Sequence, residues 1–222
     1  MQVEWYGQSA FRLTGGGTTV FIDPFGDVAA LATRGLEFGY PAISGVDADL
    51  LLVTHEHLDH SGVEAIGGEP VILRSTAGRL ESPIGEVVAV ASEHDRAAGT
   101  ERGPNTIFVF SLDGLRVAHF GDFGQSALRD EQADAIGSVE LLFIPVGGGP
   151  TIDGERAAAV AERLRARWIV PMHYRTPRVN FLETAEGFLE RMPGVRRLDA
   201  PAFDTSNLRA DDAPLAIVPA AP

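Results

Sequence analysis

The sequence of 222 residues contains no cysteine. Disulfide bonds and thiolate metal sites are therefore excluded, and the cysteine content gives no information on the redox compartment. Residues 1–6 lack both a basic region and an apolar core, so no signal peptide is apparent. No apolar run approaches the roughly 18 residues that a membrane-spanning helix needs. These absences predict a cytoplasmic protein without a membrane partner.

Positive charge is also scarce. Asp and Glu outnumber Lys and Arg by 31 to 18, which gives a formal net charge of −13. Nucleic-acid-binding proteins usually carry a basic patch. The local candidate, the arginine-rich stretch of residues 162–167, is better explained as the C-terminal end of a helix, where the dipole favours cations. The sequence thus predicts no nucleic acid partner and favours a small-molecule substrate, and it leaves open whether the chain forms a homo-oligomer.

Residues 54–62, Thr-His-Glu-His-Leu-Asp-His-Ser-Gly, are the most informative segment. They place His55, His57, Asp59 and His60 within six positions, directly after an apolar run. Neutral imidazoles and carboxylates are ligands that Zn²⁺ and similar divalent ions prefer. A polar turn explains one His-x-His pair, but it explains four ligand-type residues in six positions poorly. The segment therefore predicts a metal site.

Three further strand-like runs are each followed by a residue that can bind a metal ion: His94, Asp122 and His173. In α/β sheets, ligands bind in the crevice outside the carboxyl ends of the strands. We therefore expect all seven residues to converge at one edge of the structure. Seven protein ligands suffice for two ions and leave room for a water or a substrate.

The order of these residues resembles the metallo-β-lactamase superfamily, in which a His-x-His-x-Asp-His motif is followed by His, Asp and His. Other segments resemble the UlaG-like branch of metal-dependent hydrolases: residues 22–25, 93–95, 102–106, 119–124, 145–148 and 171–174. The resemblance covers roughly residues 1–200. It implies an α/β fold, a four-layer αββα sandwich with helices flanking two packed sheets.

The resemblance also implies how the ligands are divided between two ions. One ion would be held by His55, His57 and His94, the second by Asp59, His60 and His173, and Asp122 would bridge them. Zn²⁺ is the expected metal, and Mn²⁺ is an alternative because geometry and availability decide occupancy. The chain departs from many relatives at Gln8, where they have the histidine of a Gly-His-Ser segment. Gln8 is not among the implied ligands, so the metal site is unaffected.

Hydrolysis by a metal-bridging hydroxide is the predicted chemistry, because two neighbouring cations lower the pKa of a shared water toward 7. A small ester, lactone or phosphoester is the expected substrate. Asp59 and Asp122 are the expected catalytic residues, since they hold the ions and can accept a hydrogen bond from the hydroxide. The alternative is a metal-binding protein with a redox or structural role and no hydrolytic turnover. His94 counts against a flavodiiron type of redox site, which usually has a carboxylate there.

Four further residues have two interpretations each. Arg175 and Arg178 follow His173 closely, so they either bind an anionic substrate through a bidentate fork or form surface salt bridges of little energetic weight. Asp23 is either a partner of a ligand histidine or a turn residue. His119 is explained better by a buried hydrogen bond than by direct metal ligation.

Hydrophobic patterning and turn residues give a coarse map of the elements. Strands are expected at residues 3–6, 11–13, 18–22, 49–53, 70–73, 86–90, 106–112, 115–120, 140–145, 167–171 and 194–198. Helices are expected at residues 155–167 and 181–191. Residues 1–200 are predicted to form a single hydrolase domain. Residues 201–222, rich in Pro, Ala and Asp, are predicted to be a C-terminal tail of uncertain order.

Overall fold

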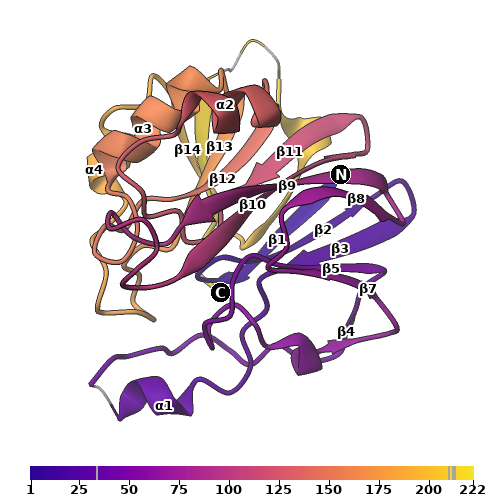
Figure 1. The fold of residues 1–222 in the computed structure, drawn as a ribbon, viewed down its shortest axis with the longest axis horizontal. Coiled ribbons are helices and arrows are strands. Elements are labelled where there is room, and N and C mark those ends of the chain that lie inside the picture. The colour runs from indigo at the N-terminus through magenta and orange to yellow at the C-terminus, as the bar shows by residue number, and fades with distance from the viewer. Residues whose placement is uncertain (34, 210, 212–213) are drawn as a thin grey trace.

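Two β-sheets packed face to face form the centre of the computed structural model, which describes all residues except 34, 210 and 212–213 (Figure 1). The first sheet has six strands, in the spatial order β15 (Ala202–Asp204), β1 (Gln2–Gly7), β2 (Ala10–Gly15), β3 (Thr18–Ile22), β5 (Leu50–Val53) and β7 (Val71–Arg74). The strands from β1 to β3 run antiparallel, whereas β3, β5 and β7 run parallel.

The second sheet has eight strands. Their order is β14 (Val195–Arg197), β16 (Leu215–Val218), β13 (Trp168–Met172), β12 (Leu141–Pro145), β11 (Leu115–His119), β10 (Pro104–Leu112), β9 (Gly85–Glu93) and β8 (Gly78–Ser82). β10 is antiparallel to both β9 and β11, and β11, β12 and β13 are parallel. The strands β9, β11, β12 and β13 therefore end at the same edge of this sheet.

Helices cover the outer faces of the two sheets, which confirms the predicted four-layer αββα sandwich (Figure 1). The helices α2 (Asp130–Ile136), α3 (Gly154–Arg163) and α4 (Glu186–Leu189) lie over the eight-stranded sheet. The layer over the six-stranded sheet is thinner. It contains α1 (Ala29–Ala32), a 3₁₀ turn at Val63–Ala65, and the short pair β4 (Val46–Asp47) and β6 (Ile66–Gly67).

The main hydrophobic core lies between the two sheets. The rings of Phe11, on the first sheet, and Phe143, on the second, are 4.6 Å apart between centroids. All residues of β5, β12 and β13 are buried. These strands read as continuous apolar runs because parallel strands in such a sandwich are covered on both faces.

The predicted C-terminal tail is wrong. In the described part of residues 201–222, β15 pairs with β1, and β16 inserts between β13 and β14 with every residue buried. The segment reads as a tail because β16 has only four apolar residues and lies among Pro, Ala and Asp. Its place in the sheet is decided by neighbours that are distant in the sequence. Residues 210 and 212–213 of this prediction lie outside the described residues.

The predicted helices are found with different bounds. The helix expected at residues 155–167 is α3, which begins after the cap residue Asp153 and ends at Arg163. The helix expected at 181–191 is reduced to α4. Its expected first turn is not helical. Leu182 is buried in a second, smaller apolar cluster with Phe25 and Tyr40, and the Glu183 N–H donates to the Gly147 carbonyl. Among the described residues, no helix has the length and apolar character needed to cross a membrane.

Candidate metal centre

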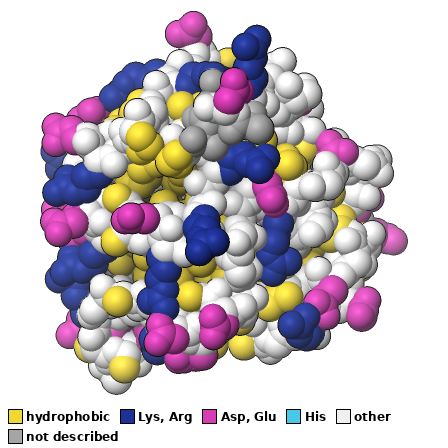
Figure 2. Space-filling view, turned by 90° about the horizontal axis from the view of Figure 1, so that it is seen from above, with side chains coloured by type: hydrophobic (Ala, Val, Ile, Leu, Met, Phe, Trp, Pro, Cys, Tyr) yellow, Lys and Arg dark blue, Asp and Glu magenta, His cyan; other side chains and the backbone are white. Residues whose placement is uncertain are grey.

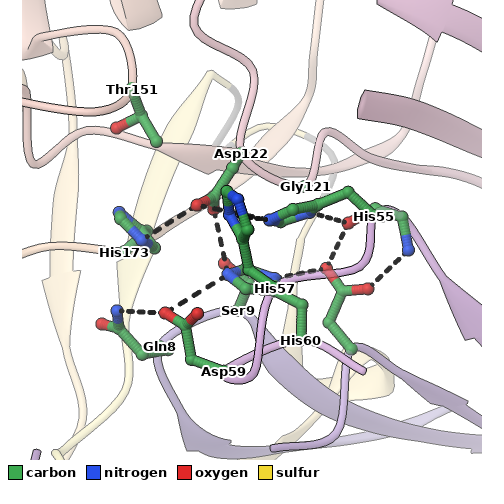
Figure 3. Close-up of polar contacts among 12 residues, drawn as sticks. Gln8, Ser9, His55, His57, Asp59, His60, Gly121, Asp122, Thr151 and His173 are labelled. Carbon is green, nitrogen blue, oxygen red and sulfur yellow. Dashed lines mark hydrogen bonds and ion pairs between the residues drawn. The ribbon is translucent and has the colours of Figure 1, made fainter. Parts of the chain in front are cut away.

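All seven predicted ligands meet at one edge of the sandwich, where four strands end. Figure 3 labels all of them except His94. The loop after β5 supplies four of them, and the residues that follow β9, β11 and β13 supply one each. Their ligand atoms form three groups, each with all atoms within 4.8 Å of one another: His55, His57 and His94; His55, His60 and Asp122; Asp59, His60 and His173. The structure thus brings together the whole set that the sequence indicates.

Asp122 lies between two of these groups: the first group, His55, His57 and His94, and the second group, Asp59, His60 and His173, which together are called the outer groups. Its Oδ2 atom is 3.1 Å from His94 Nε2 and 3.2 Å from His173 Nε2, and its Oδ1 atom is 3.3 Å from His60 Nε2. One carboxylate therefore faces histidines of both groups (Figure 3). This is the arrangement expected of a residue that bridges two ions.

The donor atoms in the cluster fit divalent cations. His55 Nε2 and His57 Nδ1 are 3.1 Å apart, and the two rings are nearly perpendicular. His60 Nε2 and Asp122 Oδ1 are buried 3.3 Å from each other, and neither has a hydrogen-bond partner outside the cluster among the described residues. Buried polar atoms without a partner are costly, and a cation bound by imidazole nitrogens and a carboxylate satisfies them.

Asp23 orients two of the histidines. Its Oδ2 atom accepts a hydrogen bond from His60 Nδ1 at 3.0 Å and another from the Thr54 hydroxyl at 2.7 Å. The Thr54 hydroxyl is in turn 3.0 Å from His55 Nδ1 and accepts its proton. With the proton on Nδ1, the Nε2 atoms of His55 and His60 point into the cluster as lone-pair donors. Of the two interpretations of Asp23, the structure favours the histidine partner.

The other side of the centre is fixed by backbone groups and an amide. His94 Nδ1 donates to the carbonyl of Pro150 at 3.1 Å. The Asp122 N–H donates to Asn105 Oδ1 at 3.0 Å, and Asn105 is itself held by the carbonyl of Phe120. Gly121, with φ of +53°, passes so close to Asn105 that a Cβ atom there would lie 2.4 Å from Oδ1. Glycine is thus required for the chain to turn into Asp122.

Burial and neighbouring charges shift the pKa values of the cluster in opposite directions. Burial and the neighbouring His60 hold the pKa of His55 well below its ordinary value, and burial and His94 lower the pKa of His57. Burial alone would lower the pKa of His60, but the charges of Asp122 and Asp59 raise it well above normal. Burial would raise the pKa of Asp122, but His173, His60 and His94 hold it well below normal. A cation that binds here therefore competes with protons for the imidazole nitrogens of the cluster.

Comparison with known proteins gives the family. The model of the beta-lactamase superfamily domain matches residues 2–173. The chain belongs to the metallo-β-lactamase superfamily. A UPF0173 protein of Pyrococcus furiosus is 32% identical, and the match covers 79% of this chain and 84% of that protein. A UPF0173 metal-dependent hydrolase of Thermococcus kodakarensis is 31% identical, and the match covers 79% of this chain and 85% of the hydrolase.

A solved structure extends the superfamily likeness to almost the whole chain. It is a Thermotoga maritima protein assigned to the Zn-dependent hydrolases of the metallo-beta-lactamase superfamily, with 26% sequence identity and a TM-score of 0.78. The alignment covers 98% of both chains. It therefore extends beyond residue 173, where the family match ends.

Arg175 and Arg178 form no hydrogen bond or ion pair with the seven candidate ligands among the described residues. Both side chains are exposed. Arg178 Nε donates to the carbonyl of Pro222 at 3.2 Å. Arg175 lines a hollow of about 340 Å³ together with Thr184 and Ala220. Neither predicted role, substrate contact or surface salt bridge, is established by these contacts.

His119 is buried and lies outside the three groups of ligand atoms. Its Nε2 atom is 3.0 Å from the carbonyl of Ser9, and its Nδ1 atom accepts from the Gly121 N–H at 3.2 Å. Both ring nitrogens are therefore used in hydrogen bonds. This agrees with the interpretation of His119 as a buried hydrogen-bonding residue.

Sequence reasoning missed three residues that support the site: Thr54, Asn105 and Gln8. Thr54 precedes the motif, and its hydroxyl beside His55 was a signal that could have been used. The sequence around Asn105 favours a turn residue over a role in the site, yet Asn105 is 1% exposed at the start of β10. Gln8 was noted as a departure from relatives, without a role.

Proposed function

We propose that this member of the metal-dependent hydrolases of the metallo-β-lactamase superfamily binds two divalent cations and cleaves a small ester, lactone or phosphoester. Zn²⁺ is the first choice of metal, and Mn²⁺ is the alternative. The observation that carries the proposal is the position of Asp122, whose two oxygens face histidines of both outer groups. When bound, the cations would supply an ionised water as nucleophile and stabilise the developing oxyanion.

The chain's own carboxylates have different tasks in this reaction. Asp122 is buried with its pKa well below normal, mainly because three histidines oppose the effect of burial, so it stays ionised and holds charge at the centre. The Asp59 side chain is 16% exposed, compared with 3% for Asp122. Asp59 therefore offers the carboxylate oxygen that accepts a proton from the attacking water and exchanges it with solvent.

His57 and Asp59 are the two half-buried members of the cluster, so a substrate would approach the centre from their side. Leu58 lies between them and is 51% exposed. Such a surface suits a small molecule with an apolar part. Arg175, which has no ion-pair partner among the described residues, remains our candidate for an anionic group of the substrate.

We further propose that the chain acts in the cytoplasm, within the UlaG-like branch, and without a nucleic acid or membrane partner. The chain has a net charge of −13. Figure 2 shows that basic and acidic side chains are interspersed over the side of α2 and α3, without a continuous basic area. Such a surface lacks the electrostatic footprint of nucleic acid binding.

The test is hydrolysis by the chain after chelator treatment and after reconstitution with Zn²⁺ or Mn²⁺. Activated esters, a lactone and a phosphodiester serve as substrates, with an exposed-residue variant such as Asp134→Ala as the protein control. We expect turnover of at least one class that is lost with the metal and regained on reconstitution. Metal binding without turnover of any class would favour the redox or structural alternative.

A further inference from the structure

The tip of the first hairpin reaches into the metal centre. β1 and β2 pair up to Gly7 and Ala10, so that Gln8 and Ser9 form a two-residue loop. Loop tips are usually exposed, but both residues of this one are completely buried. The tip must therefore be held by contacts with the site rather than by solvent.

The backbone of Gln8 is in a conformation that its side chain does not favour. Its φ is +48°, in the left-handed region. Turn positions of this kind usually take Gly, Asn or Asp, because other side chains clash with the backbone there. A long side chain kept at such a position indicates a local role that offsets the strain.

Gln8 contacts two ligands of the same group. Its Nε2 atom donates to Asp59 Oδ2 at 3.4 Å (Figure 3). Its main-chain carbonyl accepts from the His173 N–H at 3.3 Å. The same carbonyl accepts from Trp5 Nε1 at 3.0 Å. The Trp5 ring stacks on Tyr174, the residue after His173, with centroids 5.7 Å apart. One residue thus fixes Asp59 through its side chain and the His173 loop through its backbone.

The side-chain oxygen of Gln8 has no such partner. Its Oε1 atom is buried and makes no hydrogen bond with any described residue. Most buried polar atoms in folded proteins have a hydrogen-bond partner. The free acceptor points to a group outside the chain, such as a water or substrate donor beside Asp59.

We propose that Gln8 is a positioning residue for the ion held by Asp59, His60 and His173, and that it sets the affinity of that ion selectively. The inference rests on the proposed two-ion function. His55, His57 and His94 receive no hydrogen bond from Gln8 among the described contacts. Loss of the amide should therefore weaken one ion and spare the other.

The experiment is a calorimetric Zn²⁺ titration of the metal-free full chain, with a competing chelator to resolve tight binding. Gln8→Gly removes the side chain and relieves the backbone, whereas Gln8→Met keeps the length and the strain but removes the amide. Arg165→Gly is the matched control, because Arg165 is exposed at the end of α3 with a φ of +51°. Thermal unfolding of each metal-free protein is measured in parallel.

We expect Arg165→Gly to bind two ions with the same two affinities as the wild type. Both Gln8 variants should bind one ion as tightly as the wild type and the other about 10- to 100-fold more weakly. The unfolding temperature of Gln8→Gly should be no lower than that of Gln8→Met, because glycine relieves the backbone strain. A loss of affinity that both variants share would then not result from a folding defect.

Unchanged affinity for both ions in the two Gln8 variants would overturn the inference and leave the two-ion function standing. Equal weakening of both ions would also overturn it, since the effect would not be selective. A wild type that binds a single ion would contradict the proposed function instead. In that case, weaker binding of the single ion in both variants would still support a positioning role, and unchanged binding would refute it.

Discussion

The two outer groups of donors are supported in different ways. In the first group, the Nδ1 atoms of His55 and His94 bond to the Thr54 hydroxyl at 3.0 Å and to the Pro150 carbonyl at 3.1 Å. These partners are neutral, and both side chains are buried. Two of its three ligands therefore keep one ring orientation and one tautomer before any cation binds.

The second group has weaker and more varied support. His60 bonds to Asp23 at 3.0 Å, but Asp59 is held by a long contact of 3.4 Å from Gln8. His173 has a φ of +50°, and its Nδ1 atom is buried without a hydrogen-bond partner among the described residues. We therefore expect the ion of the second group to bind less tightly than the ion of the first group. Substitutions of supporting residues should change the affinity of the second-group ion more.

Removal of Asp122 should have the largest effect, because this residue faces histidines of both groups and its loss should weaken both ions. In Asp122→Ala, both ions should bind more weakly, and hydrolysis should fall by about 10³-fold or more, since several kcal/mol of transition-state stabilisation are lost. Elemental analysis and steady-state kinetics measure the two effects. Asp134→Ala, an exposed carboxylate change on α2, should alter neither. Retention of both metals and activity in Asp122→Ala would refute the bridging role.

Single-group substitutions should separate the two ions. His94→Ala should weaken the ion of the first group, and His173→Ala the ion of the second, by more than the 10- to 100-fold typical of supporting residues. In the wild type, a chelator added stepwise should remove the second-group ion first. Metal content and residual activity at each step measure this. Identical binding curves for the two variants would mean that the groups are not separate sites.

Asp23→Asn should weaken both ions, because Asp23 supports His60 directly and His55 through Thr54. An amide nitrogen in place of Oδ2 would face two donors, His60 Nδ1 and the Thr54 hydroxyl. We expect about 10- to 100-fold weaker binding of metal and about 1–3 kcal/mol lower stability, measured by titration and denaturant unfolding. Asp134→Asn, an exposed change on α2, is the control. Metal affinities equal to the wild type would remove Asp23 from the account.

The smallest expected effect lies outside both groups, at His119. Burial lowers the pKa of this histidine, so the folded chain keeps it neutral below the ordinary value of about 6.5. The unfolded chain takes up the proton as the pH falls below about 6.5, which favours unfolding. In the metal-free protein, His119→Gln should reduce this loss of stability by at most about 1.4 kcal/mol per pH unit. Denaturant unfolding at pH 7.5, 6.5 and 5.5 tests the slope, and parallel curves for the two proteins would contradict the burial argument.

Much of the metal centre could be predicted because its ligands follow apolar strands. The apolar runs that lead to His55 and His173 predict buried strands, and parallel strands bring their carboxyl ends together. The supporting residues could not be found in this way. Gln8 meets Asp59 across 51 residues of chain, and Asn105 meets Asp122 across 17. Such contacts depend on how the two sheets pack rather than on any local pattern.

The fold errors have a similar cause. β16 is a four-residue apolar run, too short to be distinguished from a loop, and it becomes a strand because β13 and β14 flank it. α2 has seven residues and was not predicted. Its Gln132 side chain accepts from the Arg129 N–H and donates to the carbonyl of Ala91, so the helix is fixed by a tertiary contact as well as by its cap.

The most direct test of the account is anomalous diffraction from crystals of the zinc-loaded chain. The account predicts two peaks about 3.5–4 Å apart, one beside His55, His57 and His94 and the other beside Asp59, His60 and His173, with Asp122 in contact with both. The first-group peak should have the higher occupancy at limiting zinc. A single peak at saturating zinc, or two peaks without Asp122 between them, would contradict the central claim.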